Sequence, residues 1–245
     1  MPVQQEWDQH LARHLDNPIW SALTTDHAAL GLGDDRARRY PPDIGPLSGI
    51  PAQSAESYAS LAQLAVPGGA GFAGAVALFL QEPPRLPEGW TLLRGGVLDQ
   101  MIAPQPRPLA PVNLPGVELR RLTAADAPAM VELAHLTEPG PFQLRTLELG
   151  TFFGVLQAGR LLAMAGKRIH VPGAIEVSGV CTHPDARGRG YARHLMSRVM
   201  EEIVQAGRMA FLHTLASNDA AIQIYESLGF VRRRSLELAA IRRDA

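Results

Sequence analysis

The sequence predicts an α/β fold, and most of the observations behind this prediction lie in the second half of the chain. Short apolar runs that alternate with polar residues are bounded there by Gly- and Pro-containing turns, a pattern typical of strands. Two longer segments repeat apolar residues every three or four positions, which is typical of helices that pack on one face. Three successive strands joined by tight turns indicate antiparallel pairing, and the strands that follow helices complete a mixed sheet.

The composition indicates a folded protein of one large domain or two small ones. The chain has 245 residues, of which 46% are hydrophobic and 19% are charged, close to the average of globular proteins. A proline-rich stretch over residues 103–116 favours an extended, semi-rigid chain, so we interpret it as a linker. The linker separates a smaller N-terminal α/β region, residues 1–102, from a domain over residues 117–245.

The N-terminal region carries no motif that indicates catalysis. It holds two helix-like segments near its start and two strand-like runs, residues 71–80 and 90–102. A region of this size could be a decayed copy of the second domain, and that interpretation stays open.

The second domain has capping and turn residues at the expected ends of its helices and strands. Thr123 followed by Asp126 resembles a capping box at a helix start, and Gly207 and Gly229 are placed where helices end. In chain order we expect a strand at 117–122, a helix at 124–136, a hairpin of strands 151–157 and 160–170 around Ala158-Gly159, a strand at 174–182, a helix at 190–206, a strand at 209–215, a helix after 217–219 and a strand at 230–241.

The charge balance and the single cysteine exclude several classes of protein. Lys and Arg number 23 against 24 Asp and Glu, so the chain lacks the basic footprint of a general nucleic-acid binder. Cys181 is the only cysteine, which rules out an intrachain disulfide or a cysteine-based zinc site. The polar, acidic start predicts no secretory signal, and the longest apolar run, residues 70–80, is too short to span a membrane. We expect a cytoplasmic protein without metal, membrane or nucleic-acid partner.

The most informative segment is CTHPDARGRGYARHLM, residues 181–196, in which a strand leads through a Gly- and Arg-rich loop into a long helix. Gly188 and Gly190 let the backbone approach a ligand closely, and the helix start offers unpaired N–H groups to a pyrophosphate. Arg187 and Arg189 add positive charge at the rim. In isolation, RGRG is better explained as a flexible basic loop. Its position between a strand and a long helix favours an anion-binding loop instead, and the glycine patterns of dinucleotide-binding folds and P-loops are absent.

These residues carry a resemblance to a known family. The R-x-x-G-x-A pattern from Arg187 to Ala192 resembles the signature of the Gcn5-related N-acetyltransferase (GNAT) superfamily. LASNDAAIQIYESLGF, residues 215–230, is similar to a later motif of that superfamily. TEPGPF, residues 137–142, together with the loop resembles its FR47-like branch. The resemblance covers about the last half of the chain and implies a mixed, mostly antiparallel sheet flanked by helices; the N-terminal region would then be a degenerate GNAT-like half or unrelated.

The resemblance implies acetyl-CoA as cofactor, with its pyrophosphate on loop N–H groups and its pantetheine arm along the preceding strand. A strand edge with unpaired backbone groups suits the two amides of pantetheine. The implied cofactor-binding residues are Val180, Cys181, Thr182, Arg187, Gly188, Arg189, Gly190, Tyr191, Ala192, Arg193, Asn218, Ala221 and Tyr225.

Two candidate catalytic residues are Tyr225 and Glu176. The resemblance implies that Tyr225 is the general acid that protonates the departing CoA thiolate; a packing aromatic is the alternative. A free amine also needs a proton acceptor. Glu176 is the candidate base, with a solvated strand carboxylate as the alternative, and His213 competes for the role because some relatives carry a glutamate base there. Cys181 is better explained as a small buried hydrophobe than as a nucleophile.

The predicted function is transfer of an acetyl group from acetyl-CoA to a primary amine by direct attack. The acceptor, a small molecule or a peptide amine, is not identified by the sequence, and a homodimer is compatible with it. One alternative is an acetyl-CoA-binding sensory or regulatory module without turnover. A nucleic-acid binder that uses RGRG and Arg232–Arg234 is disfavoured by the near-neutral charge and the few aromatic residues.

Overall fold

The structure is a computed structural model that describes residues 3–66, 74–107, 109 and 116–244, with only the backbone for residues 3–8. Contacts divide the chain into two compact units. Unit 1 comprises Met1–Asp99, Ile169–Gly173 and Arg234–Ala245, and unit 2 comprises Gln100–Arg168 and Ala174–Arg233. This division differs from the predicted boundaries 1–102 and 117–245, because the end of the last strand pairs within unit 1. Much of the predicted linker, residues 103–116, lies outside the described residues.

Unit 2 contains a mixed sheet, as predicted. Its strands follow the order β5-β10-β9-β8-β7-β6, with β6 and β8 antiparallel to β7 and β10 parallel to β9. The elements of this unit are β6 (Glu118–Arg121), η2 (Ala124–Asp126), α5 (Ala127–Thr137), η3 (Thr146–Leu149), β7 (Phe152–Gln157), β9 (Ala174–Thr182), η4 (Pro184–Ala186), α6 (Tyr191–Gln205), β10 (Met209–Leu215) and α7 (Asp219–Ser227), with parts of β5 (Trp90–Ala103), β8 (Arg160–Val171) and β11 (Val231–Arg243).

Local signals in the sequence set several of these boundaries. The Asp126 carboxylate accepts a hydrogen bond of 2.8 Å from the Thr123 N–H, so the predicted capping pair precedes α5. Ala158 and Gly159 both adopt positive φ, 49° and 81°, and close the β7–β8 hairpin as expected. The Asn218 side chain accepts from the Ala221 N–H at 3.3 Å and thereby caps α7.

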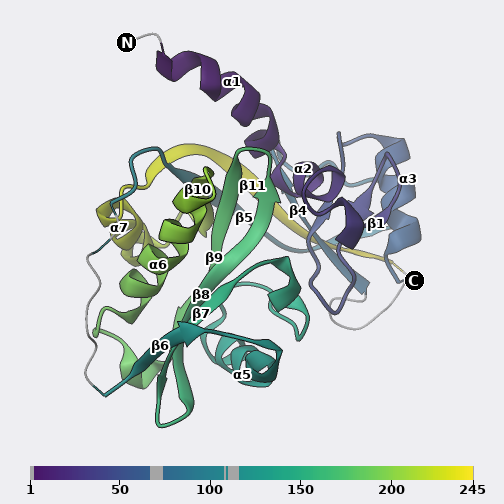
Figure 1. Cartoon of the computed structure of the whole chain (residues 1–245). Helices are drawn as coiled ribbons and strands as arrows, with labels where there is room; N and C mark the ends of the chain where they lie inside the picture. Colours follow the sequence, from purple (N-terminus) through teal and green to yellow (C-terminus); the bar gives the residue numbers. More distant parts are fainter. Residues whose placement is uncertain (1–2, 67–73, 108, 110–115, 245) are drawn as a thin grey trace. The chain divides into compact units, whose positions relative to one another are not determined.

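Helices cover both faces of the sheet in unit 2, with α6 and α7 on one side and α5 on the other (Figure 1). Neighbouring strand residues divide between two cores accordingly. Phe153 and Ala165 pack with residues of α6, whereas Phe152 and Met164 pack with residues of α5. This alternation is what a strand buried on both faces requires.

Unit 1 combines short elements with parts of three long strands. Its small sheet has the order β1-β2-β3, and β4 pairs antiparallel with β11 from Leu80 opposite Glu237 to Ala75 opposite Arg242. The elements are α1 (Val3–Asp16), α2 (Pro18–Thr24), η1 (Ala28–Leu30), β1 (Leu32–Gly33), β2 (Arg38–Arg39), β3 (Ser48–Gly49), α3 (Ala55–Leu64) and β4 (Ala75–Leu80), with parts of β5, β8 and β11.

The two strand predictions for the N-terminal region are met by β4 and β5. The predicted run 71–80 appears as a strand over residues 75–80, and its residues 71–73 lie outside the described residues. Tyr58 and Leu61 of α3 pack with Val76 and Leu78 of β4 in the core of this unit. The kinship of this region with a GNAT-like half stays a prediction.

Candidate active site

The parallel strands β9 and β10 pair only at their beginnings. Residues 174–176 of β9 lie opposite residues 209–211 of β10, and within the described residues both strands run on, to Thr182 and Leu215, without further pairing to each other. The edge of β9 on the β10 side is therefore open beyond Glu176. An extended ligand with amide groups could add to such an edge as a strand would.

Gly179 shifts the side-chain alternation of β9 inside this opening. Its φ of 62° is left-handed, a conformation that glycine adopts without strain. Val177 and Val180, three residues apart, both pack on the α6 core, while Cys181 packs on the α5 core. One residue is thus added to the alternation, as in a β-bulge. Val180, Cys181 and Thr182, the predicted pantetheine strand, follow this bulge directly.

The Gly- and Arg-rich loop leads into the first turn of α6. Gly188 and Gly190 have a φ of 76°, and Gly190 is the N-cap of the helix, without a side-chain cap. The first N–H groups of a helix have no partner inside it, so these groups are available to an anion. Arg187, Arg189 and Arg193 are exposed around the loop. Tyr191, in contrast, is buried in the α6 core.

Tyr225 lies on the α6 face of the sheet. It is partly buried, packs against the α6 core and forms a hydrogen bond with the Thr214 side chain on β10. Burial raises the pKa of Tyr225, and the bond to Thr214 opposes this rise in part. The phenol therefore keeps its proton near neutral pH, as a general acid must. Asn218 and Ala221, two other predicted cofactor contacts, begin the same helix.

Glu176 lies on the opposite face and is fully buried. Arg168 donates to it twice, from Nε and Nη2, at 2.8 Å each, and His213 Nδ1 lies 2.7 Å from Oε1. Burial raises the pKa of this carboxyl, but the Arg168 charge and the hydrogen bonds outweigh it and hold the pKa at about 2. The alternative of a solvated carboxylate is wrong. A buried, ion-paired carboxylate with so low a pKa is also a weak proton acceptor.

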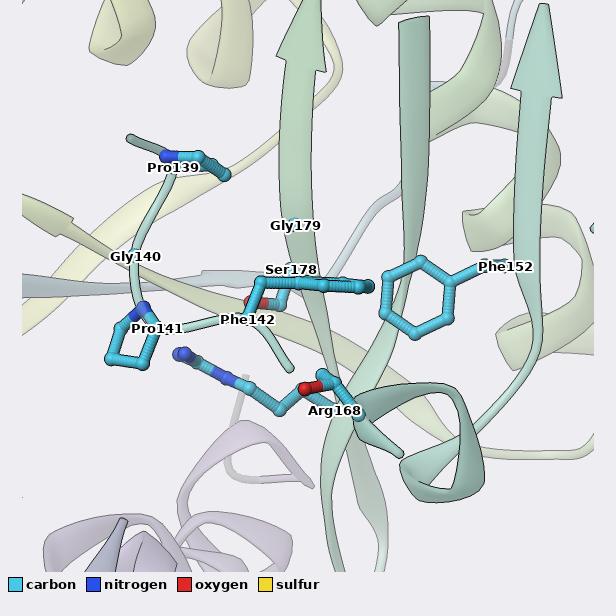
Figure 2. Close-up of a pocket in the computed structure, with 9 residues that line it drawn as sticks. Pro139, Gly140, Pro141, Phe142, Phe152, Arg168, Ser178 and Gly179 are labelled. Carbon is cyan, nitrogen blue, oxygen red and sulfur yellow. The ribbon is translucent and has the colours of Figure 1, made fainter. Parts of the chain in front are cut away.

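A pocket opens beside the bulge, on the α5 face (Figure 2). It is lined by Pro139, Gly140, Pro141, Phe142, Thr146, Phe152, Arg168, Ser178 and Gly179. In Figure 2 the Phe142 ring points toward the Phe152 ring; their centroids are 5.5 Å apart and the planes nearly perpendicular, at 89°. The pocket is thus mostly apolar, and its polar side chains are Arg168, Ser178 and Thr146.

The remaining candidates have clear surroundings. Cys181 is buried, and burial raises the pKa of its thiol to about 11, so it stays a protonated thiol as expected of a small hydrophobe.

In the described part of the chain no group of three or more His, Cys, Asp or Glu side chains could hold a metal ion. Among those same residues, no helix combines the length and apolar character needed to cross a bilayer.

Sequence reasoning missed three residues that surround His213 and Glu176. Arg168 pairs with Glu176, and Gln100 and Arg233 continue the network beyond His213. Arg168 and Glu176 stand four residues before and after Pro172, the predicted turn, so their symmetric opposite charges were a usable signal. Gln100 and Arg233 come from strands distant in the sequence and carry no such signal.

Comparisons with known proteins identify a family and a solved structure with the same fold. The model of a family described as FR47-like protein matches residues 152–238. The crystal structure of a putative acetyltransferase from the GNAT family of Novosphingobium aromaticivorans is 38% identical, covers 94% of this chain and 99% of its own, and has a TM-score of 0.83. The fold and site define a mixed α/β protein in which two parallel strands, β9 and β10, pair at their beginnings and then separate. The chain belongs to the GNAT family, with an FR47-like segment.

Curated relatives match part of the chain. Mycothiol acetyltransferase of Saccharopolyspora erythraea is 31% identical over 166 residues, which are 60% of this chain and 55% of that protein. The chain therefore spans little more than half the length of this relative. [Ribosomal protein bS18]-alanine N-acetyltransferase of Escherichia coli K12 is 28% identical over 134 residues, 51% of this chain and 90% of that protein. These names give two different acceptors, so the relatives do not select one for this chain.

Proposed function

We propose that this protein is an N-acetyltransferase that moves an acetyl group from acetyl-CoA directly to a primary amine. The observation that carries the proposal is the open edge of β9 beyond Glu176, which lies directly before the glycine loop and the uncapped start of α6. An extended ligand that ends in phosphates fits this succession of an open strand edge and a helix N-terminus. The names of the relatives support the same chemistry.

The residues of the chain would hold the donor mainly through the backbone. Val180, Cys181 and Thr182 would bind the pantetheine amides along the strand edge. The N–H groups of residues 188–193 would bind the pyrophosphate, and Arg187, Arg189 and Arg193 would meet the remaining phosphate. Neither Gly188 nor Gly190 has an atom within 3.5 Å of where a Cβ would stand, so the loop leaves open space for such a ligand. Bound acetyl-CoA would supply an activated thioester carbonyl.

Thr214 and His213 are consecutive on β10 and therefore point to opposite faces. Tyr225, bonded to Thr214, lies on one face, and the pocket with Glu176 lies on the other. In the proposed reaction the acceptor enters through the pocket, and its nitrogen bonds to the thioester carbon. Tyr225 donates its hydroxyl proton to the sulfur as the C–S bond breaks. The amine releases its proton to water, because the side chains of Glu176 and His213 are 0% and 2% exposed.

A thiol-release assay with acetyl-CoA tests this proposal against amino acids, polyamines, aminoglycosides and peptide N-termini. Tyr225→Phe should lower kcat by about 100-fold or more, the usual contribution of a general acid, with little change in acetyl-CoA affinity. Tyr58→Phe is the matched control, since Tyr58 carries a hydrogen-bonded hydroxyl in unit 1. Unchanged turnover in Tyr225→Phe would remove it from the acid role. Binding of acetyl-CoA without thiol release for any amine would favour the regulatory module.

A further inference from the structure

A chain of side-chain hydrogen bonds crosses five strands at the point where β9 and β10 part. It starts at Arg168 on β8, passes through Glu176 on β9 and His213 on β10, and ends at Gln100 on β5 and Arg233 on β11. Glu176 is the last residue of β9 that is paired with β10. The network therefore lies at the base of the opening proposed to hold the donor.

Arg233 determines which atom donates and which accepts in the hydrogen bonds from Arg233 through Gln100 to His213. A guanidinium only donates, so the Gln100 oxygen, Oε1, must be the atom that accepts from Arg233 Nη1 at 2.9 Å. The Gln100 nitrogen, Nε2, then faces His213 Nε2 at 3.1 Å. Because an amide nitrogen only donates, His213 Nε2 must be the acceptor and carries no proton.

The other end of the network requires the same arrangement. Glu176 is ionised, because the Arg168 guanidinium donates to both of its oxygens at 2.8 Å, and a carboxylate only accepts. His213 Nδ1, which lies 2.7 Å from Glu176 Oε1, must therefore carry the proton and donate it. Both ends agree on one form of the ring, neutral with the proton on Nδ1.

Protonation of His213 at Nε2 would set two donors against each other. The Nε2–H would face the Gln100 N–H₂ group, and a rotation of the amide to relieve this contact would turn the N–H₂ group toward Arg233. The Phe211 ring lies edge-to-face with the imidazole, with the ring centroids 5.6 Å apart. Of the charged groups in the network, Glu176 contacts His213 directly, Arg233 reaches it through Gln100, and Arg168 lies behind Glu176.

We infer that Gln100 and Arg233 are positioning residues that hold His213 as the neutral Nδ1–H tautomer. His213 then ties β10 to the Glu176 carboxylate at the base of the opening and does not take the proton of the acceptor amine. Under this assignment neither candidate base, Glu176 or His213, accepts the proton of the amine. Gln100 and Arg233, which lie outside the recognised motifs, fix the tautomer of His213.

Nitrogen NMR of the protein labelled with ¹⁵N-histidine tests the inference without any acceptor. The His213 signals among the 8 histidines are assigned as those missing from His213→Gln. At neutral pH we expect His213 Nδ1 to resonate as a protonated nitrogen and Nε2 as an unprotonated one. The opposite pattern, or two protonated nitrogens, in the unaltered protein would overturn the inference whether or not Gln100→Glu folds.

Gln100→Glu adds a matched perturbation. A carboxylate at this position cannot donate, so His213 Nε2 should gain a proton and its resonance should move to the protonated range. Gln157→Glu, the same change at the exposed end of β7, should leave the His213 signals in place. If Gln100→Glu folds and the His213 signals do not move, Gln100 does not set the tautomer.

Kinetics separate this inference from the proposed function. If thiol release occurs but the His213 nitrogens show the opposite protonation pattern, the proposed function stands and the positioning role fails. If no amine supports thiol release, the proposed function fails, while the tautomer measured by NMR stands or falls by itself.

Discussion

A buried histidine in unit 1, His27, which lies beside the partly exposed His170, predicts that this unit loses stability in mild acid. His27 is 6% exposed, its Nδ1 lies 2.7 Å from the Tyr40 hydroxyl, and its ring centroid is 4.8 Å from that of His170. Burial, and then the neighbouring His170, lower the pKa of His27 from 6.5 to about 4, although Asp26 opposes the change. The folded unit therefore binds this proton less readily than the unfolded chain does.

The sign and size of the effect follow from these two pKa values. A pKa that is lower in the folded state gives stability that is fully present above about pH 6.5 and is lost as the pH falls through about 4. The difference between 6.5 and about 4 corresponds to about 3 kcal/mol, at about 1.4 kcal/mol for each pH unit. From proton linkage, about 2 kcal/mol of this free energy of unfolding should be lost between pH 7 and pH 5.

Urea unfolding followed by tryptophan fluorescence can measure this loss in the right unit. All three tryptophans, Trp7, Trp20 and Trp90, belong to unit 1. Between pH 7 and pH 5 the free energy of unfolding should fall by about 2 kcal/mol in the unaltered protein. His27→Gln, which keeps a polar partner for Tyr40 but does not titrate, should show a fall smaller by that amount. His10→Gln, at an exposed histidine of α1, should behave like the unaltered protein.

Equal pH slopes in the unaltered protein and in His27→Gln would refute this reasoning. The neighbouring ring offers a second check, because His170 is one of the two causes that lower the pKa of His27. His170→Asn should therefore reduce the slope without abolishing it. If His170→Asn steepens the slope, the two imidazoles do not repel each other's protons.

Two further predictions concern the second half of the chain. Because burial raises the pKa of Cys181 to about 11, Cys181→Ala should retain turnover, and mass spectrometry after incubation with acetyl-CoA should find no acetyl group on Cys181; an adduct would contradict direct transfer. Gly190→Ala should lower the free energy of unfolding by about 1 kcal/mol, because Gly190 has a left-handed φ of 76°, and it should raise the KM for acetyl-CoA. Gly207→Ala is the control: Gly207 has a φ of 68° and nothing within 4 Å of its Cβ position. This variant should lose similar stability at unchanged KM. An equal KM in both variants would remove the loop from donor binding.

The elements of the second half could be predicted because each boundary has a local cause. Thr123 and Asp126 begin a helix, Ala158-Gly159 closes a hairpin and Asn218 caps α7, and all three act within a few residues of chain. The division into units has no such cause. It depends on the pairing of β11 with β4, for instance Ile241 opposite Val76, and no short segment of sequence reports that contact.

The same distinction applies to the site. Glu176 was singled out from its strand, yet its properties come from Arg168 and His213, which hold its pKa at about 2 rather than near that of a solvated carboxylate. Gln100 and Arg233 are 133 positions apart, and only the meeting of β5 and β11 brings them together. Residues proposed to act through the backbone, such as Gly190, could be predicted from the sequence because the proposed role needs a residue type and a helix start, not a distant partner.

Two residues that the sequence assigns to one catalytic pair turn out to lie on different faces of the sheet. Tyr225 bonds to Thr214, and Glu176 bonds to His213, the residue before it on β10. Side chains of consecutive strand residues point apart, so an acid and a proton acceptor placed in this way cannot meet in one pocket. Under the proposed roles, Tyr225 and an acceptor amine that enters through the pocket can reach one thioester only through the opening between β9 and β10. The parting of these strands is then a requirement of the chemistry as well as of donor binding, and closing it should abolish both.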